Sequence, residues 1–186
     1  MKTPIVIKPL FSNSLFNLVR DITDDQFAYN KVNVHDNTRT FYNVNQLRIV
    51  QNSMIPWVND LTNNHNLVSS DNSITLFLYD SSINVQVSNY DCAVLVPLYQ
   101  HNKSWNFYLS DIMAHNEVFY SVNIYKSKVK KQIDNLNDSI SWHKINLNPN
   151  NALVFNPKQQ LLYSDKMIGQ CAVVTSLFYN YDNIRK

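Results

Sequence analysis

Histidine and carboxylate side chains are the residues of this sequence whose types and spacing suggest chemistry, because neutral imidazoles and carboxylates bind transition metals. Five histidines are present. His115 and Glu117 are two positions apart, which places both side chains on one face of a strand, and His143 is a candidate third ligand. The spacing therefore allows a metal site made of these three residues. The competing interpretation is that the histidines lie exposed in loops rich in Asn and Ser.

Two cysteines are the remaining candidates for nucleophilic chemistry. Cys92 and Cys171 both lie in apolar runs typical of strands, where a reduced, buried thiol is the ordinary state. A disulfide between them requires that their two strands be neighbours. The sequence has no nucleophile elbow and no phosphate-binding loop, because these motifs need several glycines and the chain has one, Gly169.

Asparagine is expected to replace glycine in the turns of this chain, because it tolerates the left-handed region better than other residues with a Cβ. We expect this role at 63–64 and at 150–151, among other places. Gly169 should then lie where any Cβ would clash, with a positive φ or in close packing. The bias toward Asn, Lys, Ile and Tyr also fits an AT-rich genome, which suggests a virus or an AT-rich microbe as the source.

Charge and hydropathy exclude several classes of function. The formal net charge is +2, from 16 basic and 14 acidic residues, which is too balanced for a surface that binds nucleic acid. No apolar run approaches the roughly 20 residues of a membrane helix, and the first residues lack the apolar core of a signal peptide. We therefore expect a cytoplasmic or virion protein, without a nucleic-acid or membrane partner.

The apolar pattern predicts helices first and strands afterwards. Apolar positions at intervals of three and four predict a helix that Ser12 or Ser14 caps, and a second helix over 43–59. We expect this second helix to kink or break near 53–55, with Pro56 opening a further short helix. Short β-branched and aromatic runs, separated by Asn, Asp, Ser or Pro, predict strands. The predicted strands are 5–7, 74–79, 83–87, 92–99, 105–109, 118–125, 140–145, 152–155, 161–163 and 171–179.

These elements predict an α+β fold of one domain over residues 1–186. Helices in the N-terminal part, 1–70, would pack on a mainly antiparallel jelly-roll or double-stranded β-helix sandwich formed by 71–180, with 181–186 as a tail. Adjacent aromatic residues along the strands place one ring of each pair outward. Such rings could serve a protein–protein surface or a sugar-stacking platform, unless the helices or the second sheet cover them.

Two segments resemble the double-stranded β-helix of the 2-oxoglutarate/iron(II) dioxygenases. Residues 83–91 followed by 93–98 are similar to the family's first metal strand, its His-x-Asp motif and the next core strand. Residues 151–157, 162–164 and 169–179 are similar to its closing strands. The resemblance implies a facial triad of two histidines and one carboxylate, with an arginine that pairs with the carboxylate of 2-oxoglutarate.

The residues at these positions depart from the family pattern. Asn89 stands where the resemblance implies the first histidine, and only Asp91 matches. Tyr163 or Ser164 stands at the distal histidine, and Cys171 stands at the arginine. Asn and Tyr do not replace two imidazoles, and without arginine the bidentate clamp for the cosubstrate is lost. The resemblance therefore implies a degenerate site at Asn89, Asp91, Tyr163 and Cys171.

The sequence leads to three functional hypotheses. The first is a non-catalytic jelly-roll structural or interaction protein, such as a component of a virus (phage) particle. This protein would take no metal or cofactor, and its partners would be proteins, in a homo-oligomer or a larger assembly. The alternative is an iron(II)/2-oxoglutarate-dependent hydroxylase, with His115, Glu117 and His143 as the metal ligands. The third is a carbohydrate-binding module. Convergence of Asn89, Asp91 and Tyr163 in one pocket would identify a degenerate dioxygenase site.

Overall fold

A computed structural model describes residues 5–7, 9–29, 38–77, 89–100, 105–111, 141–165 and 171–184. Predictions for the strands over 83–87 and 118–125 and for Gly169 lie outside these residues. The elements, in chain order, are β1 (Ile5–Ile7), α1 (Asn13–Tyr29), β2 (Thr38–Tyr42), α2 (Asn45–Thr62), β3 (Leu67–Phe77), β4 (Cys92–Gln100), β5 (Trp105–Ser110), β6 (Trp142–Leu147), β7 (Ala152–Phe155), β8 (Leu162–Ser164), β9 (Cys171–Asn180) and α5 (Tyr181–Ile184).

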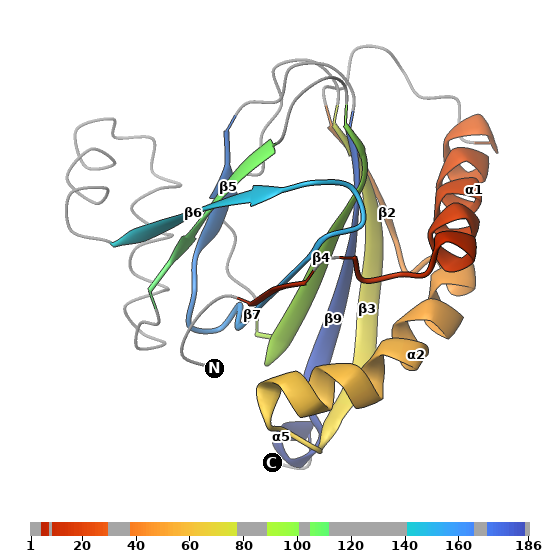
Figure 1. Cartoon of the computed structure of the whole chain (residues 1–186). Helices are drawn as coiled ribbons and strands as arrows, with labels where there is room; N and C mark the ends of the chain where they lie inside the picture. Colours follow the sequence, from red (N-terminus) through yellow and green to blue (C-terminus); the bar gives the residue numbers. More distant parts are fainter. Residues whose placement is uncertain are drawn as a thin grey trace.

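The described strands form two antiparallel sheets. The large sheet has the order β1-β7-β4-β9-β3-β2, and the small sheet has the order β6-β5-β8. Helices α1 and α2 cover one face of the large sheet, and the small sheet lies on its other side (Figure 1). The predicted α+β class, with helices on a jelly-roll or double-stranded β-helix sandwich, is confirmed. The sandwich also takes in β1 and β2 from the N-terminal part of the chain.

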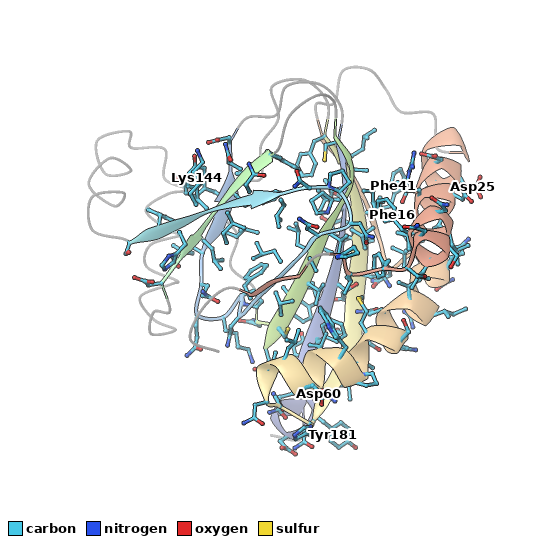
Figure 2. The ribbon with its side chains drawn as sticks, viewed as in Figure 1. Phe16, Asp25, Phe41, Asp60, Lys144 and Tyr181 are labelled. Carbon is cyan, nitrogen blue, oxygen red and sulfur yellow. The ribbon has the colours of Figure 1, made fainter. Side chains whose placement is uncertain are left out.

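Two apolar cores fill the spaces on either side of the large sheet. The first lies between the helices and the sheet and includes Val19, Leu47, Val58, Ile74 and Phe178. Phe16 of α1 and Phe41 of β2, both labelled in Figure 2, are partly buried and pack against this core. The second core lies between the two sheets; it includes Phe77, Leu95, Trp105, Phe107, Leu109, Leu147, Leu153 and Val173. We call them the helix-side core and the inter-sheet core.

Helix α2 runs as one element from Asn45 to Thr62 although it contains Pro56. The prediction of a break, with a second helix opening at the proline, is therefore wrong, while Figure 1 shows that the helix bends along its course. Its buried residues Leu47, Val50, Met54 and Val58 recur at helical spacing on both sides of the proline. Packing of this continuous stripe on the sheet holds the two halves together despite the lost hydrogen bond.

Asparagine takes left-handed positions in this chain, as predicted. Asn63 ends α2 with a φ of 50°, and Asn150 precedes β7 with a φ of 66°. Asn43, which the sequence pattern did not single out, has a φ of 53° before α2. The Asn150 side chain also bonds the backbone of Phe11 in both directions, at 2.9 Å each. This turn therefore fixes the approach to α1 against the large sheet.

The two cysteines are both free and buried. Their strands β4 and β9 are neighbours, but Cys171 lies opposite Gln100 whereas Cys92 lies opposite Phe178. The thiols also belong to different cores, because Cys92 faces the helices and Cys171 faces the small sheet. A disulfide between them is therefore excluded by geometry. None of the described helices has the length and apolar character that crossing a membrane requires.

Candidate functional site

Asp91, the one residue that matches the dioxygenase motif, is held by polar contacts of its own. Its Oδ1 accepts a hydrogen bond from Lys158 Nζ at 2.8 Å, and its Oδ2 accepts one from the backbone N–H of Asn180 at 2.7 Å. The backbone N–H of Asp91 donates to the carbonyl of Phe178 at 3.0 Å. These bonds join the start of β4 to the turn after β7 and to the end of β9. Both carboxylate oxygens are thus engaged in holding strands together.

The other predicted site residues lie in different parts of the molecule. Asn89 is exposed in the bend before β4. The Tyr163 ring stacks on Tyr108 at 4.7 Å and meets Trp142 edge-on at 4.8 Å, on the face of the small sheet that points away from the large one. Cys171 is fully buried in the inter-sheet core, where burial raises its pKa to about 12. The structure therefore does not bring these residues together around one point.

Ser164, the second candidate for the distal histidine position, is buried in β8 and donates a hydrogen bond from its Oγ to the backbone carbonyl of Asp165 at 3.0 Å. The neighbouring Asp165 carboxylate accepts from Asn106 at 2.9 Å and from Tyr108 at 3.2 Å. Ser164 lies opposite Phe107 on the inward face of the small sheet, whereas the Asp165 carboxylate bonds Tyr108 of the outer aromatic face. These polar groups supply no imidazole and no cation.

His143 is described, whereas His115 and Glu117 lie outside the described residues. His143 Nε2 is 2.5 Å from Asp111 Oδ1, and both side chains are about half exposed. Hydrogen bonds from His143 and Ser141 lower the pKa of the Asp111 carboxyl. His143 lies opposite Leu109, which in turn lies opposite Leu162. Sequence reasoning missed Asp111, although it lies two residues after a predicted strand and four before His115.

A cavity of about 520 Å³ opens on the face of the large sheet that turns toward the small sheet. One wall is polar and comes from β2, β3 and β9, where Thr40 and Thr75 share a hydrogen bond at 3.0 Å. The opposite wall is apolar. The described residues that line the cavity are Thr40, Tyr42, Asn43, Asp71, Asn72, Ser73, Thr75, Phe77, Tyr90, Ala93, Leu95, Phe155, Pro157, Leu162, Val173, Thr175 and Leu177.

One end of the cavity contains a carboxylate and aromatic rings. The hydroxyl of Tyr90 donates to Asp71 Oδ2, and the ring of Tyr90 packs on Tyr179 with centroids 4.5 Å apart. Burial, and then the hydrogen bond to Asp71, raises the pKa of Tyr90 well above its ordinary value. The phenol is therefore protonated and acts as a donor at any physiological pH. Sequence reasoning missed both Asp71 and Tyr90.

An irregularity in β3 positions Asp71. The register between β3 and β9 shifts between Ser69 and Asn72, which is the arrangement of a β-bulge that re-aims side chains. Gln51 of α2 is buried and donates its Nε2 to the carbonyl of Asp71 at 2.9 Å and to that of Leu177 at 3.0 Å. The helix thus satisfies backbone groups that the bulge leaves without a strand partner. The polar pair Asp71-Asn72 inside a strand is the sequence signal of this irregularity.

The sheet order, with two facing antiparallel sheets and helices on the outer face of the larger one, defines a double-stranded β-helix. Comparison with solved structures confirms the fold. HygX from Streptomyces hygroscopicus with nickel and 2-oxoglutarate has a TM-score of 0.64 at 11% identity, over 95% of this chain and 82% of that one. EctD from S. alaskensis with 2-oxoglutarate and 5-hydroxyectoine has a TM-score of 0.67 at 8% identity, over 97% and 73% of the two chains.

A prolyl-4-hydroxylase from Pseudomonas putida gives a TM-score of 0.63 at 6% identity, over 95% of this chain and 92% of that one. No family model and no curated protein sequence matches the chain. The predicted resemblance to the 2-oxoglutarate/iron(II) dioxygenases is confirmed at the level of the fold. At sequence identities this low, structural similarity establishes the fold but not the residues of a functional site.

The prediction that the protein takes no cofactor is corrected by these comparisons. Structures of the same fold have been solved with iron, with nickel and 2-oxoglutarate, or with 2-oxoglutarate. The described residues do not form a metal site on their own, however, because no three of their His, Cys, Asp or Glu side chains lie close enough together to hold a metal ion. A metal site in this chain would need ligands from the residues that the structure leaves undescribed.

Proposed function

We propose that this protein is an oxygenase of the iron(II)/2-oxoglutarate-dependent type that acts on a small molecule held in the cavity between its sheets. The likeness in fold, over 95% or more of this chain to HygX, EctD and the prolyl-4-hydroxylase, is the observation that carries the proposal. The fold supplies a cavity of about 520 Å³, within the range of volumes that small-molecule sites have.

The wall chemistry of this cavity supports binding of an organic molecule. Apolar side chains from β4, β7 and β9 line one side, and hydroxyl groups from β2, β3 and β9 line the other. Such a mixture is typical of ligand pockets, in which apolar contacts provide affinity and a few polar groups fix orientation. Sequence-distant strands contribute to both walls, so the cavity exists only in the folded chain.

The proposal assigns the metal to His115, Glu117 and His143. Two neutral imidazoles and a carboxylate form the ligand set that suits iron(II). The described partner of His143 is Asp111, and the chain that leaves Asp111 reaches His115 after four residues. Asp111 itself is a second carboxylate for the same site. Asp91 is not assigned to the metal, because Lys158 and the Asn180 N–H occupy its oxygens.

Metal analysis of the purified full-length chain tests this proposal. After anaerobic addition of iron(II) and removal of free metal, we expect about one iron per chain and consumption of 2-oxoglutarate that depends on iron. The His143→Ala and His115→Ala variants should lose both. His65→Ala is the matched control, since His65 is exposed in the turn after α2. A wild-type chain that retains no iron, or variants that retain as much as the wild type, would contradict the proposal.

A second candidate is a non-catalytic binding protein on the same fold. The observation that favours it is that Asp91, the one match to the dioxygenase motif, is engaged with Lys158 and Asn180 in a structural role. The expected protein partners, a homo-oligomer or larger assembly and a place in a virus particle remain predictions. Sugar binding also remains a prediction. The rings of Tyr108 and Tyr163 stack on each other, so each has only one face left for a sugar.

A further inference from the structure

Asp71 is the one charged side chain among the described residues that line the cavity. Lysine, arginine and histidine are all missing from that part of the lining. An anionic ligand at this end of the cavity would therefore meet a carboxylate without a compensating positive charge. A cation would instead find a partner of opposite charge in a partly enclosed space, where water screens the attraction less than it does on an open surface.

The Asp71 carboxylate has capacity for a further donor. Its Oδ2 accepts from the Tyr90 hydroxyl, while within the described part of the chain no hydrogen bond reaches its Oδ1. An ionised carboxylate has about four acceptor positions on its two oxygens. The β3 bulge and the two hydrogen bonds from Gln51 fix the backbone that carries it. The group is thus held in place yet not saturated, in contrast to Asp91.

Two tyrosines, Tyr42 and Tyr90, line the same cavity as this carboxylate. Tyr90 lines the cavity and packs on Tyr179, and Tyr42 lines the cavity while its side chain remains largely exposed. A cation within about 6 Å of the face of a tyrosine ring is attracted by the π electrons. A carboxylate together with tyrosine rings is a combination that suits a protonated amine. The apolar wall, which includes Leu95, Phe155 and Leu162, is available to a hydrocarbon portion of the same molecule.

We propose that the cavity binds a protonated amine with an apolar body, whose ammonium group contacts Asp71 and Tyr90. That the amine is the substrate rests on the proposed oxygenase function. That the cavity binds an amine depends only on the residues that line it. In this arrangement the ammonium group donates to the open oxygen of Asp71 and lies against the Tyr90 ring. The alkyl or aryl portion then packs toward the apolar wall. The carboxylate excludes fatty acids and other carboxylic acids from the same position.

Calorimetric titration of the full-length protein at pH 7 tests the inference with three probes of equal chain length: hexylammonium, hexan-1-ol and hexanoate. An alkyl amine is protonated at this pH, because its pKa is about 10. We expect hexylammonium to bind most tightly and hexanoate not to bind. Asp71→Asn should weaken hexylammonium about tenfold or more, since it removes a charge-assisted hydrogen bond but keeps the shape and an acceptor for Tyr90.

Asp165→Asn is the matched control, because Asp165 is a half-buried aspartate of the small sheet that does not line the cavity. It should bind hexylammonium as the wild type does, and Tyr90→Phe, which keeps the ring, should retain binding. Two results with the wild-type protein would each overturn the inference. The first is hexanoate binding as tight as hexylammonium binding, and the second is no hexylammonium binding at millimolar concentration. Amine binding without iron uptake would support this inference and reject the oxygenase function. Iron-dependent consumption of 2-oxoglutarate without amine binding would support the oxygenase function and reject this inference.

Discussion

Two aspartates, 20 residues apart in the sequence, have opposite relations to their surroundings. Asp91, before β4, gives one oxygen to Lys158 and the other to the Asn180 N–H, and its side chain is 17% exposed. Asp71, in the β3 bulge, meets the neutral hydroxyl of Tyr90 and faces a cavity. The first carboxylate joins three segments of the chain. The second is positioned by its neighbours and has room for a ligand, so the two should respond differently to substitution.

The largest expected effect comes from removing Asp91. Asp91→Ala removes the carboxylate that accepts from the Lys158 ammonium, which is 25% exposed, and from the Asn180 N–H. We expect the free energy of unfolding to fall by about 2–4 kcal/mol, measured by urea denaturation. Asp71→Asn should change it by less than about 0.5 kcal/mol, because no ion pair is lost and Asn can still accept from Tyr90. Equal losses from the two variants would show that the distinction between these aspartates is false.

A smaller effect is expected from Gln51, which connects α2 to the bulge that carries Asp71. Gln51→Ala leaves the carbonyls of Asp71 and Leu177 without their donor. Because these groups are in the interior, we expect a loss of about 1–3 kcal/mol in unfolding free energy. Gln46→Ala, on the exposed face of the same helix, is the control and should be close to neutral. If amine binding survives Gln51→Ala unchanged, the bulge is positioned by other contacts.

The smallest effect concerns Asp111, an exposed carboxylate that is hydrogen-bonded to His143. Its pKa lies below the ordinary value because of His143 and Ser141. A lowered carboxyl pKa stabilises the fold above the unfolded pKa, and that contribution is lost as the pH falls through the folded value. His143→Gln should raise the pKa of Asp111 toward the ordinary value, which carboxyl NMR titration would detect. An unchanged pKa would mean that Ser141, and not His143, determines it.

The strand pattern was predictable because the strands follow simple alternation or apolar runs. The predicted strands at 92–99, 105–109, 152–155 and 171–179 match β4, β5, β7 and β9 closely. The pattern predicts no strand at β2, and its strand over 74–79 covers only the second part of β3. The first half of β3 is rich in Ser, Asp and Asn, and β2 is short. Their place in the sheet depends on long-range pairing, of β2 with β3 and of β3 with β9. Local composition does not contain that information.

The candidate site was harder to predict, for a physical reason that Asp91 illustrates. From the sequence it is an aspartate in a turn before a core strand, which is also the context of a metal-binding aspartate. Its actual partner is Lys158, 67 residues further on, and only the tertiary fold brings the two together. The same holds for Asp71 and Tyr90, which meet because the bulge turns one toward the other. Long-range pairing thus decides which carboxylate is structural.

The placement of the two cysteines on opposite faces of the large sheet makes them separate reporters of local opening. Burial raises the pKa of both thiols to about 12, so neither reacts appreciably at neutral pH while the fold is closed. Detachment of the helical layer would release Cys92 alone, and separation of the two sheets would release Cys171 alone. The rates of alkylation of two single-cysteine variants would therefore show which layer loosens first, and whether a ligand in the cavity slows only the second.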